Sequence, residues 1–279
     1  MFAASPAIGS LSHRISVAWE FARSSFLVML AHRVRYVLGV VNYMVYVTVN
    51  YYLWDALFAA DPTRQKATWT LAQMQTYVAV NWVVRSAYYS NSDNIIAARI
   101  NKGEITTDLL RPTSLLVQFY GSALGEVFFR TIFMAAPVLA LALFFFNLQL
   151  PASPLHGVLF GYSVILAFHI FFAVNFMTGL CAVYTEKLQG FLWAKFMLLQ
   201  FLSGLLLPLE FFPAPLRAVF DALPFKGMAY TPMSIYLGRL DGAALWRELA
   251  LQTGWTIALM LLCSWHWMMV RRRLSSLGG

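Results

Sequence analysis

The chain has 279 residues, of which 60% are hydrophobic and only 11% are charged. Soluble domains carry about 25% charged residues, so this composition excludes an ordinary soluble enzyme and indicates a polytopic membrane protein. The formal net charge is +8, but the bases lie at the ends of apolar segments instead of forming a patch interleaved with aromatic side chains, which argues against nucleic-acid binding.

Residues 1–36 are predicted to form a cytoplasmic amphipathic and connecting helix. Apolar side chains recur at helical spacing on one face of residues 11–30, and polar side chains lie opposite them. We expect this helix to lie at the headgroups of the inner leaflet; the alternative is a soluble helix packed on a partner. The first long apolar run begins near residue 37 and is too long for a signal peptide, which predicts an uncleaved anchor. The apolar face consists of Leu11, Ile15, Ala18, Trp19, Ala22, Phe26, Met29 and Leu30.

Six apolar runs are candidate membrane spans, each of which needs roughly 20 mostly apolar residues. They cover residues 37–58, 70–89, 131–146 with a less apolar approach from 115, 155–184, 191–207 and 252–270. The second run is the weakest because it contains several polar residues. The predicted fold is therefore all-α, with one transmembrane domain of six helices over residues 37–270 and a basic cytoplasmic tail over residues 271–279.

The distribution of bases predicts the orientation, since short cytoplasmic loops are enriched in Lys and Arg. Alternate segments between the spans place 14 of the 20 bases on one side of the membrane and 6 on the other. Both termini are therefore predicted to face the cytoplasm.

The longest predicted cytoplasmic segment, residues 91–115, carries the signals of a short helix that stands off the membrane. Ser92, Asp93 and Asn94 are residue types that cap helix N-termini. An apolar-rich stretch follows, and Gly103 is a stop signal. Pro112 then prevents simple helical continuation.

On the predicted outer side, residues 208–247 are too apolar for an ordinary loop and are interrupted by five prolines. Short re-entrant helices that dip into the outer leaflet fit this pattern, because irregular backbone at membrane depth must be covered by protein or line a wet cavity. An apolar cap lying flat on the membrane surface is the alternative.

Two pairs of glycines have a four-residue spacing, Gly121 with Gly125 and Gly157 with Gly161. Small residues at this spacing let two helices approach closely. Each pair therefore predicts a helix–helix contact.

Two polar stripes recur at four-residue intervals along the first and second predicted spans. This spacing keeps side chains on one side of a helix. Facing each other, the stripes would line a polar path; the alternative is interhelical hydrogen bonding that only holds the bundle together. Arg85, near the cytoplasmic end, is expected to snorkel toward the interface. The stripes are Asn42, Tyr46 and Asn50, and Gln73, Tyr77, Asn81, Arg85 and Tyr89.

No residue pattern supports catalysis or metal binding. Phosphate-binding sequences of the forms GxxxxGK followed by Ser or Thr, and GxGxxG, are absent. The five histidines lack the spacing of metal ligands, and Cys181 and Cys263 lie inside predicted spans. We therefore expect no catalytic residue, metal site or cofactor in this chain.

Two segments resemble the permease subunit of type-2 ABC exporters, in its small six-span bacterial branch. The first is ARINKGEITTDLLRP at residues 98–112, which is similar to a glycine–acidic motif followed by Leu-Leu-Arg-Pro. The second is LSGLLLPLEFFPAPLRAVFDALPF at residues 202–225 with Gly238 downstream, which is similar to span five, its proline break and the outer re-entrant helices. With the N-terminal helix and the six-span layout, the resemblance covers almost the whole chain.

The resemblance implies export of an amphiphilic, lipid-like, drug-like or glycan substrate across the bacterial plasma (inner) membrane. Two copies of a separate ATP-binding subunit would bind ATP and Mg, and a second permease subunit, identical or different, would complete the path. The alternatives are an importer on the same scaffold, a membrane-embedded enzyme, and a secondary transporter or channel independent of ATP. Secondary transporters usually carry carboxylates inside the membrane, and Asp55 is the main candidate here.

The same resemblance implies roles by position. The segment after span two would be a coupling helix that contacts the ATPase through Asp93, Asn94, Arg99, Lys102, Gly103, Glu104, Asp108 and Arg111. Spans one, two and five would line the translocation path through Asn42, Tyr46, Asn50, Gln73, Tyr77, Asn81, Lys195, Gln200 and Ser203. The outer gate would be formed by Pro208, Glu210 and Phe211.

Overall fold

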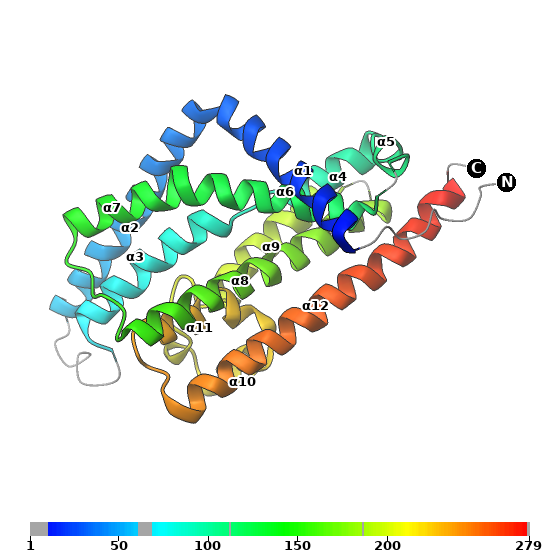
Figure 1. The fold of residues 1–279 in the computed structure, drawn as a ribbon. Coiled ribbons are helices and arrows are strands. Elements are labelled where there is room, and N and C mark those ends of the chain that lie inside the picture. The colour runs from blue at the N-terminus through cyan, green and yellow to red at the C-terminus, as the bar shows by residue number, and fades with distance from the viewer. Residues whose placement is uncertain (1–10, 61–68, 112, 186, 278–279) are drawn as a thin grey trace.

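The computed structural model describes residues 11–60, 69–111, 113–185 and 187–277. In these segments the chain is helical and forms no strand, which confirms the all-α prediction. Long helices make up the body of the molecule, and the short helices gather toward its two ends (Figure 1). The expected stop at Pro112, residues 1–10 of the predicted connecting helix and residues 278–279 of the predicted tail lie outside the described segments.

Three helical stretches in the described part of the chain are long and apolar enough to cross a membrane. They are α6 (Leu115–Arg130) continued into α7 (Ala136–Phe145), α8 (Pro154–Leu180) with its last turn, and α12 (Gly242–Leu277). α1 (Leu11–Ala31) and α2 (Arg33–Ala60) add a fourth if they count as one broken span, although they meet at 86°. The protein is therefore a multi-pass membrane protein, and the number of six spans stays a prediction.

Two of the predicted spans correspond to helices that are short or polar. α9 (Gln189–Leu202) has 14 residues, about 21 Å of helix, whereas the hydrocarbon core is about 30 Å thick. α3 (Leu71–Tyr88) has 18 residues and carries the second polar stripe. Its start is fixed by a capping box, in which the Thr70 hydroxyl accepts from the Gln73 amide and the Gln73 side chain accepts from the Thr70 amide, both at 3.2 Å.

A π-helical turn, Thr131–Ala135, joins α6 to α7. Pro137 lies two residues after this turn. Proline lacks an amide hydrogen, and its ring clashes with the carbonyl group four residues earlier in a regular α-helix. This clash accounts for the wider turn. A locally wider helix removes that clash. The two helices therefore form one continuous but interrupted rod.

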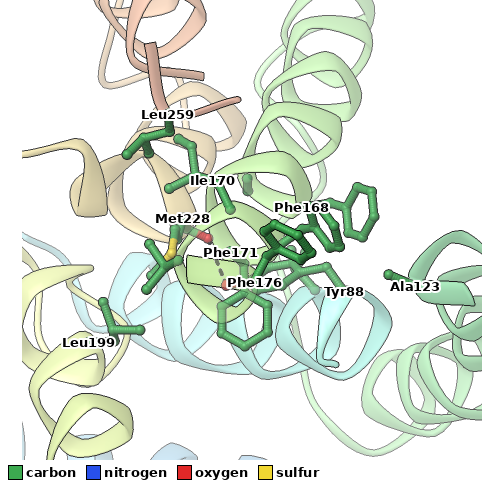
Figure 2. Packing of buried hydrophobic residues seen from close by; sticks show 14 of the residues in the cluster. Tyr88, Ala123, Phe168, Ile170, Phe171, Phe176, Leu199, Met228 and Leu259 are labelled. Carbon is green, nitrogen blue, oxygen red and sulfur yellow. Dashed lines mark hydrogen bonds between the residues drawn. The ribbon is translucent and has the colours of Figure 1, made fainter. Parts of the chain in front are cut away.

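α8 is the centre of the apolar core. Its first turn is fixed by the Ser153 hydroxyl, which accepts from the His156 amide at 3.3 Å, and every residue from Ile170 to Phe176 is buried. α12, α4 (Ser92–Asn101) and α11 (Tyr230–Tyr236) pack around it. Figure 2 shows phenylalanines of α8 inside this cluster, beside the bond that the Tyr88 hydroxyl donates to the Met228 carbonyl at 2.9 Å.

α1 packs on α6 through backbone contact, and Figure 1 shows the two helices crossing. A Cβ atom added at Gly121 would lie 3.0 Å from the Ala18 Cα, and one at Gly125 would lie 2.9 Å from the Ala22 Cα. The first glycine pair is therefore confirmed as a site of close helix approach. The second pair is not, because Gly161 faces open space and a Cβ at Gly157 would meet only the side chain of Pro151, at 3.7 Å.

The short helices expected over residues 208–247 are present. They are α10 (Ala214–Ala222), α11 and the 3-10 turns Leu209–Phe211 and Pro224–Met228. Proline occupies the first turn of α10 and of the second 3-10 segment, where a missing amide hydrogen costs nothing. α11 is buried against α8, whereas most of α10 is exposed. The depth of these helices in the membrane stays a prediction.

The C-terminal end of α12, the beginning of α1, α4 and α5 (Ile105–Leu109) lie toward one end of the molecule (Figure 1). Two cation–ring contacts support this arrangement. The Arg273 guanidinium lies 4.8 Å from the centre of the Tyr184 ring, and the Arg111 guanidinium lies 5.4 Å from the centre of the Phe21 ring. We refer to this end as the α4 end, and to the opposite end, which carries α10, as the α10 end.

We predict that Gly125→Leu destabilises the protein by about 3 kcal/mol, because a side chain at this position must separate α1 from α6. Gly161→Leu is the matched control, since a side chain there enters open space. Thermal unfolding of both purified variants in detergent measures the difference. Equal melting temperatures for the two variants would contradict the close contact between α1 and α6.

Candidate functional site

The segment after α3 folds as a helical hairpin at the α4 end. α4 ends where the Lys102 amide donates to the Ala98 carbonyl at 3.0 Å and the Gly103 amide donates to the Ile100 carbonyl at 3.0 Å. Gly103 has φ 73°, a left-handed conformation that glycine adopts without strain. α5 follows at once, so the short helix and its glycine stop are both present as expected.

An ion pair between a half-exposed arginine and a buried carboxylate holds the two arms of this hairpin together. The Arg99 guanidinium donates to the Asp108 carboxylate at 2.5 Å, and the Asp108 side chain is almost completely covered. The Gln118 amide group of α6 donates to the backbone carbonyls of Asp108, at 3.0 Å, and of Thr113, at 3.3 Å. The hairpin is therefore fixed to α6 as well as closed on itself.

A second ion pair, buried on both sides, links α4 to α8 and α9. The Lys195 ammonium of α9 donates to the Asp93 carboxylate of α4 and, at 2.6 Å, to the Asn175 side-chain oxygen of α8. The side chains of Lys195 and Asp93 are only 9% and 7% exposed. Asn175 in turn donates to the Ser90 carbonyl at 2.9 Å. We call Asp93, Asn175 and Lys195 the charge cluster; it joins α4 to α8 and α9, which lie much further along the chain.

Arg85 lies close to the charge cluster and is buried, with an exposed fraction of 5%. The expectation that it snorkels to the interface is therefore wrong. Four aromatic rings surround its guanidinium, the nearest being Phe171 at 4.3 Å, with Tyr88, Tyr89 and Phe196 within 5.7 Å. The electron-rich faces of these rings compensate for the lost water.

The remaining surface of the hairpin is open to solvent. Of the residues predicted to contact an ATPase, Asp93 and Asp108 point inward, whereas Asn94, Arg99, Lys102, Gly103, Glu104 and Arg111 are partly or fully exposed. Two apolar side chains outside the predicted set of contacts, Ile95 and Leu110, are exposed among them, Leu110 to 83%.

The two polar stripes occupy different environments. Asn42 and Tyr46 are exposed on α2, where the Tyr46 ring stacks on Trp82 at 4.5 Å. The Asn50 side chain donates to the Tyr46 carbonyl of its own helix at 2.9 Å. On α3, Gln73 caps the helix, and Tyr77 and Asn81 are buried. The Tyr77 hydroxyl donates to the Gly204 carbonyl beyond α9, at 2.5 Å, so this part of the second stripe packs against the break after α9, and a polar path between the two stripes stays a prediction.

The remaining predicted path residues surround the break after α9. Gln200 is half-buried and Ser203 is buried; the Ser203 hydroxyl donates to the Gln200 carbonyl at 3.4 Å. The Ser203 carbonyl accepts from the Tyr230 amide at 2.9 Å. The break therefore joins α3, α9 and α11.

The predicted outer gate contains a polar network next to this break. The Tyr230 hydroxyl donates to Glu210 at 2.7 Å, and the Arg239 guanidinium lies 3.6 Å from the same carboxylate. Burial, together with the Glu210 carboxylate, raises the pKa of Tyr230, so its hydroxyl stays a donor. Pro208 is buried, whereas Phe211 is largely exposed and its ring lies 5.6 Å from that of Trp54.

Comparison with known proteins gives one match. A family model described as ABC-2 family transporter protein matches residues 44–278. This range includes the helical hairpin, the charge cluster and the break after α9. No curated protein and no solved structure matches the chain significantly.

We predict that Lys195→Met destabilises the protein by about 3–5 kcal/mol, because it leaves the Asp93 carboxylate buried without a counter-charge. Adding Asp93→Asn to Lys195→Met should restore most of this loss. Arg217→Met is the control, since it removes an exposed ion pair with Asp221 that contributes at most about 1 kcal/mol. Thermal unfolding compares the variants, and a double variant less stable than Lys195→Met would contradict the predicted coupling.

Proposed function

The chain belongs to the ABC-2 family of transporter proteins, and on this premise we propose that it is the permease subunit of an ATP-driven exporter. It is a multi-pass membrane protein of the type-2 ABC permease class, a transport subunit that is not itself catalytic. The proposal is that a separate ATP-binding subunit, in two copies, binds ATP and Mg and docks at the helical hairpin. A second permease subunit, either a copy or a different chain, would complete the transporter.

The observation that carries this proposal is the construction of the hairpin. Its outer surface offers Glu104, Lys102 and the exposed Leu110 to a partner. Its inner surface is held by two ion pairs with buried carboxylates, Asp108 and Asp93, and in the second pair the Lys195 partner is buried as well. A partner that pushed on α4 would therefore move α8 and α9 with it, because breaking a buried pair is costly.

The proposed path runs along the exposed face of α2 and the break after α9. Asn42 and Tyr46 present polar and aromatic groups on a surface of α2 that is exposed among the described residues. Gln73, Asn50, Tyr77, Asn81, Gln200 and Ser203 would extend the path toward the α10 end. A mixture of aromatic faces and polar groups suits an amphiphilic substrate, whether lipid-like, drug-like or a glycan.

The proposed outer gate consists of Pro208, Glu210 and Phe211. Glu210 is held by Tyr230 and Arg239, so the turn that carries Phe211 can shift only when those contacts change. ATP binding at the opposite end would favour the open gate to the extent that the partner binds that conformation more tightly. Export of the substrate would follow from this difference in affinity.

In the proposed topology, six spans cross the plasma membrane of a bacterium and both termini lie in the cytoplasm. The α4 end then faces the cytoplasm and the α10 end faces outward. The grouping of α1, α4, α5 and the end of α12 at one end (Figure 1) supports this orientation, since the longest hydrophilic segment lies there.

Cysteine labelling tests the orientation. In a Cys181→Ser, Cys263→Ala background, we expect Leu150→Cys to react with a membrane-impermeant maleimide in intact cells. Lys102→Cys should react only after the cells are opened, because it would lie in the cytoplasm. The reverse pattern would contradict both the topology and the docking of a cytoplasmic ATPase at the hairpin.

Co-purification tests the docking surface. We expect Leu110→Glu to reduce recovery of the ATP-binding partner, and ATP hydrolysis by the complex, by about tenfold or more, because it places a charge in an apolar contact. Leu150→Glu is the matched control; it alters a leucine that is 75% exposed in the connection between α7 and α8. Equal recovery of the partner with both variants would refute the assignment of the hairpin.

A further inference from the structure

A cavity of about 540 Å³ lies between α1 and the helices α4, α5 and α6. It is separate from the polar stripes and from the outer gate. Residues of five helices line it, including Ser25 of α1, Tyr36 of α2, Arg99 of α4, Asp108 of α5 and Ser122 of α6. The proposed path and the proposed gate leave this cavity without a role.

The cavity carries an excess of positive charge. Three arginines line it, Arg99, Arg111 and Arg130, against two carboxylates, Asp108 and Glu126. Arg99 pairs with Asp108 at 2.5 Å, and Arg130 pairs with Glu126 at 3.0 Å. Arg111 forms no ion pair with the described residues, and its guanidinium lies over the Phe21 ring at 5.4 Å. One positive charge in the wall is therefore uncompensated.

The cavity also offers hydroxyl groups that the rest of the fold does not use. Ser24, Ser25 and Ser122 line it, and their hydroxyl groups form no hydrogen bond within the described part of the chain. Hydroxyl and guanidinium groups together are the donors that bind phosphate oxygens. The donor set therefore fits a phosphate anion.

One wall of the cavity is apolar and continues to the outside of the molecule. Val28 and Met29 of α1 line it next to Phe21. The Val28 side chain is also 58% exposed, and that of its neighbour Leu27 is 50% exposed. A ligand whose phosphate bonds the arginines and serines could lay a hydrocarbon chain over this wall. Free phosphate would use only the polar part.

We infer that the cavity binds the headgroup of an acidic membrane phospholipid, with the phosphate at Arg111, Ser25 and Ser122. The inference rests on the proposed function, because it needs α1 to lie at the inner membrane surface. The bound lipid would connect α1 to the hairpin that docks the ATPase. It would make the contact between those elements depend on the lipid composition of the membrane.

The test uses the full chain, delipidated in detergent and titrated with phosphatidylglycerol, phosphatidylcholine or inorganic phosphate. Native mass spectrometry counts bound lipid, and the shift of the melting temperature gives the affinity. We expect phosphatidylglycerol to bind and to raise the melting temperature of the unmodified protein. Arg111→Gln should weaken this binding about five- to tenfold, and Ser122→Leu, which fills the cavity, should weaken it at least as much.

Two controls alter the same residue types away from the cavity. Arg14→Gln and Ser16→Leu lie on α1 at exposed positions, and we expect both to bind phosphatidylglycerol as the unmodified protein does. Melting temperatures measured without lipid identify any variant that is misfolded. If Ser122→Leu does not fold, Arg111→Gln alone decides the test, because Arg111 is exposed and its substitution leaves the packing unchanged.

Three results would overturn the inference. The first is that both cavity variants bind phosphatidylglycerol as tightly as the unmodified protein does. The second is that phosphatidylcholine binds as tightly as phosphatidylglycerol. The third is that inorganic phosphate binds as tightly as the lipid, which would indicate a simple anion site. Recovery of the ATP-binding partner, measured in the same preparations, separates this inference from the proposed function. Partner recovery without lipid binding refutes only the lipid site, whereas failure of the unmodified chain to recover a partner refutes the proposed function.

Discussion

A charge inside an apolar bundle persists only if another group replaces the water that it has lost, and the α4 end of this protein is organised by that constraint. Lys195, Asp93 and Asn175 satisfy one another across α9, α4 and α8. Arg85 is covered instead by aromatic faces. The groups that neutralise Asp93 and Lys195 also fix the hairpin against two helices, α8 and α9. The same contacts therefore compensate the charges and connect the helices.

A second connection at this end uses backbone instead of charge. Because Gly121 and Gly125 have no side chains, α1 lies directly on α6 at Ala18 and Ala22. α6 also holds α5 through Gln118. α1, α5 and α6 are therefore joined by short contacts, and the cavity lined by Ser25 and Ser122 lies where this packing is incomplete.

Composition, hydropathy and short motifs were sufficient to predict a multi-pass helical protein, the helix that ends at Gly103 and the family. They could not predict which charges pair, because Asp93 and Lys195 are 102 residues apart and no local pattern connects them. They also could not distinguish Gly121 and Gly125 from Gly157 and Gly161, since the spacing is identical and only the neighbouring helix differs. Arg85 was misplaced for the same reason: the rings of Phe171 and Phe196 come from α8 and α9.

α12 is longer than a bilayer requires. Residues 249–270 contain no Asp, Glu, Lys or Arg and span about 33 Å of helix, close to the thickness of a hydrocarbon core of about 30 Å. Glu248, which pairs with Lys226 at 2.9 Å, lies at one limit and Arg271 at the other, so charged residues bound the apolar stretch. A helix whose apolar stretch is longer than the hydrocarbon core is thick tilts to keep that stretch inside it. Arg273 contacts Tyr184 near the end of α8, so a tilt of α12 would shift the end of the core helix as well. The geometry of the bundle would then depend on the thickness of the membrane.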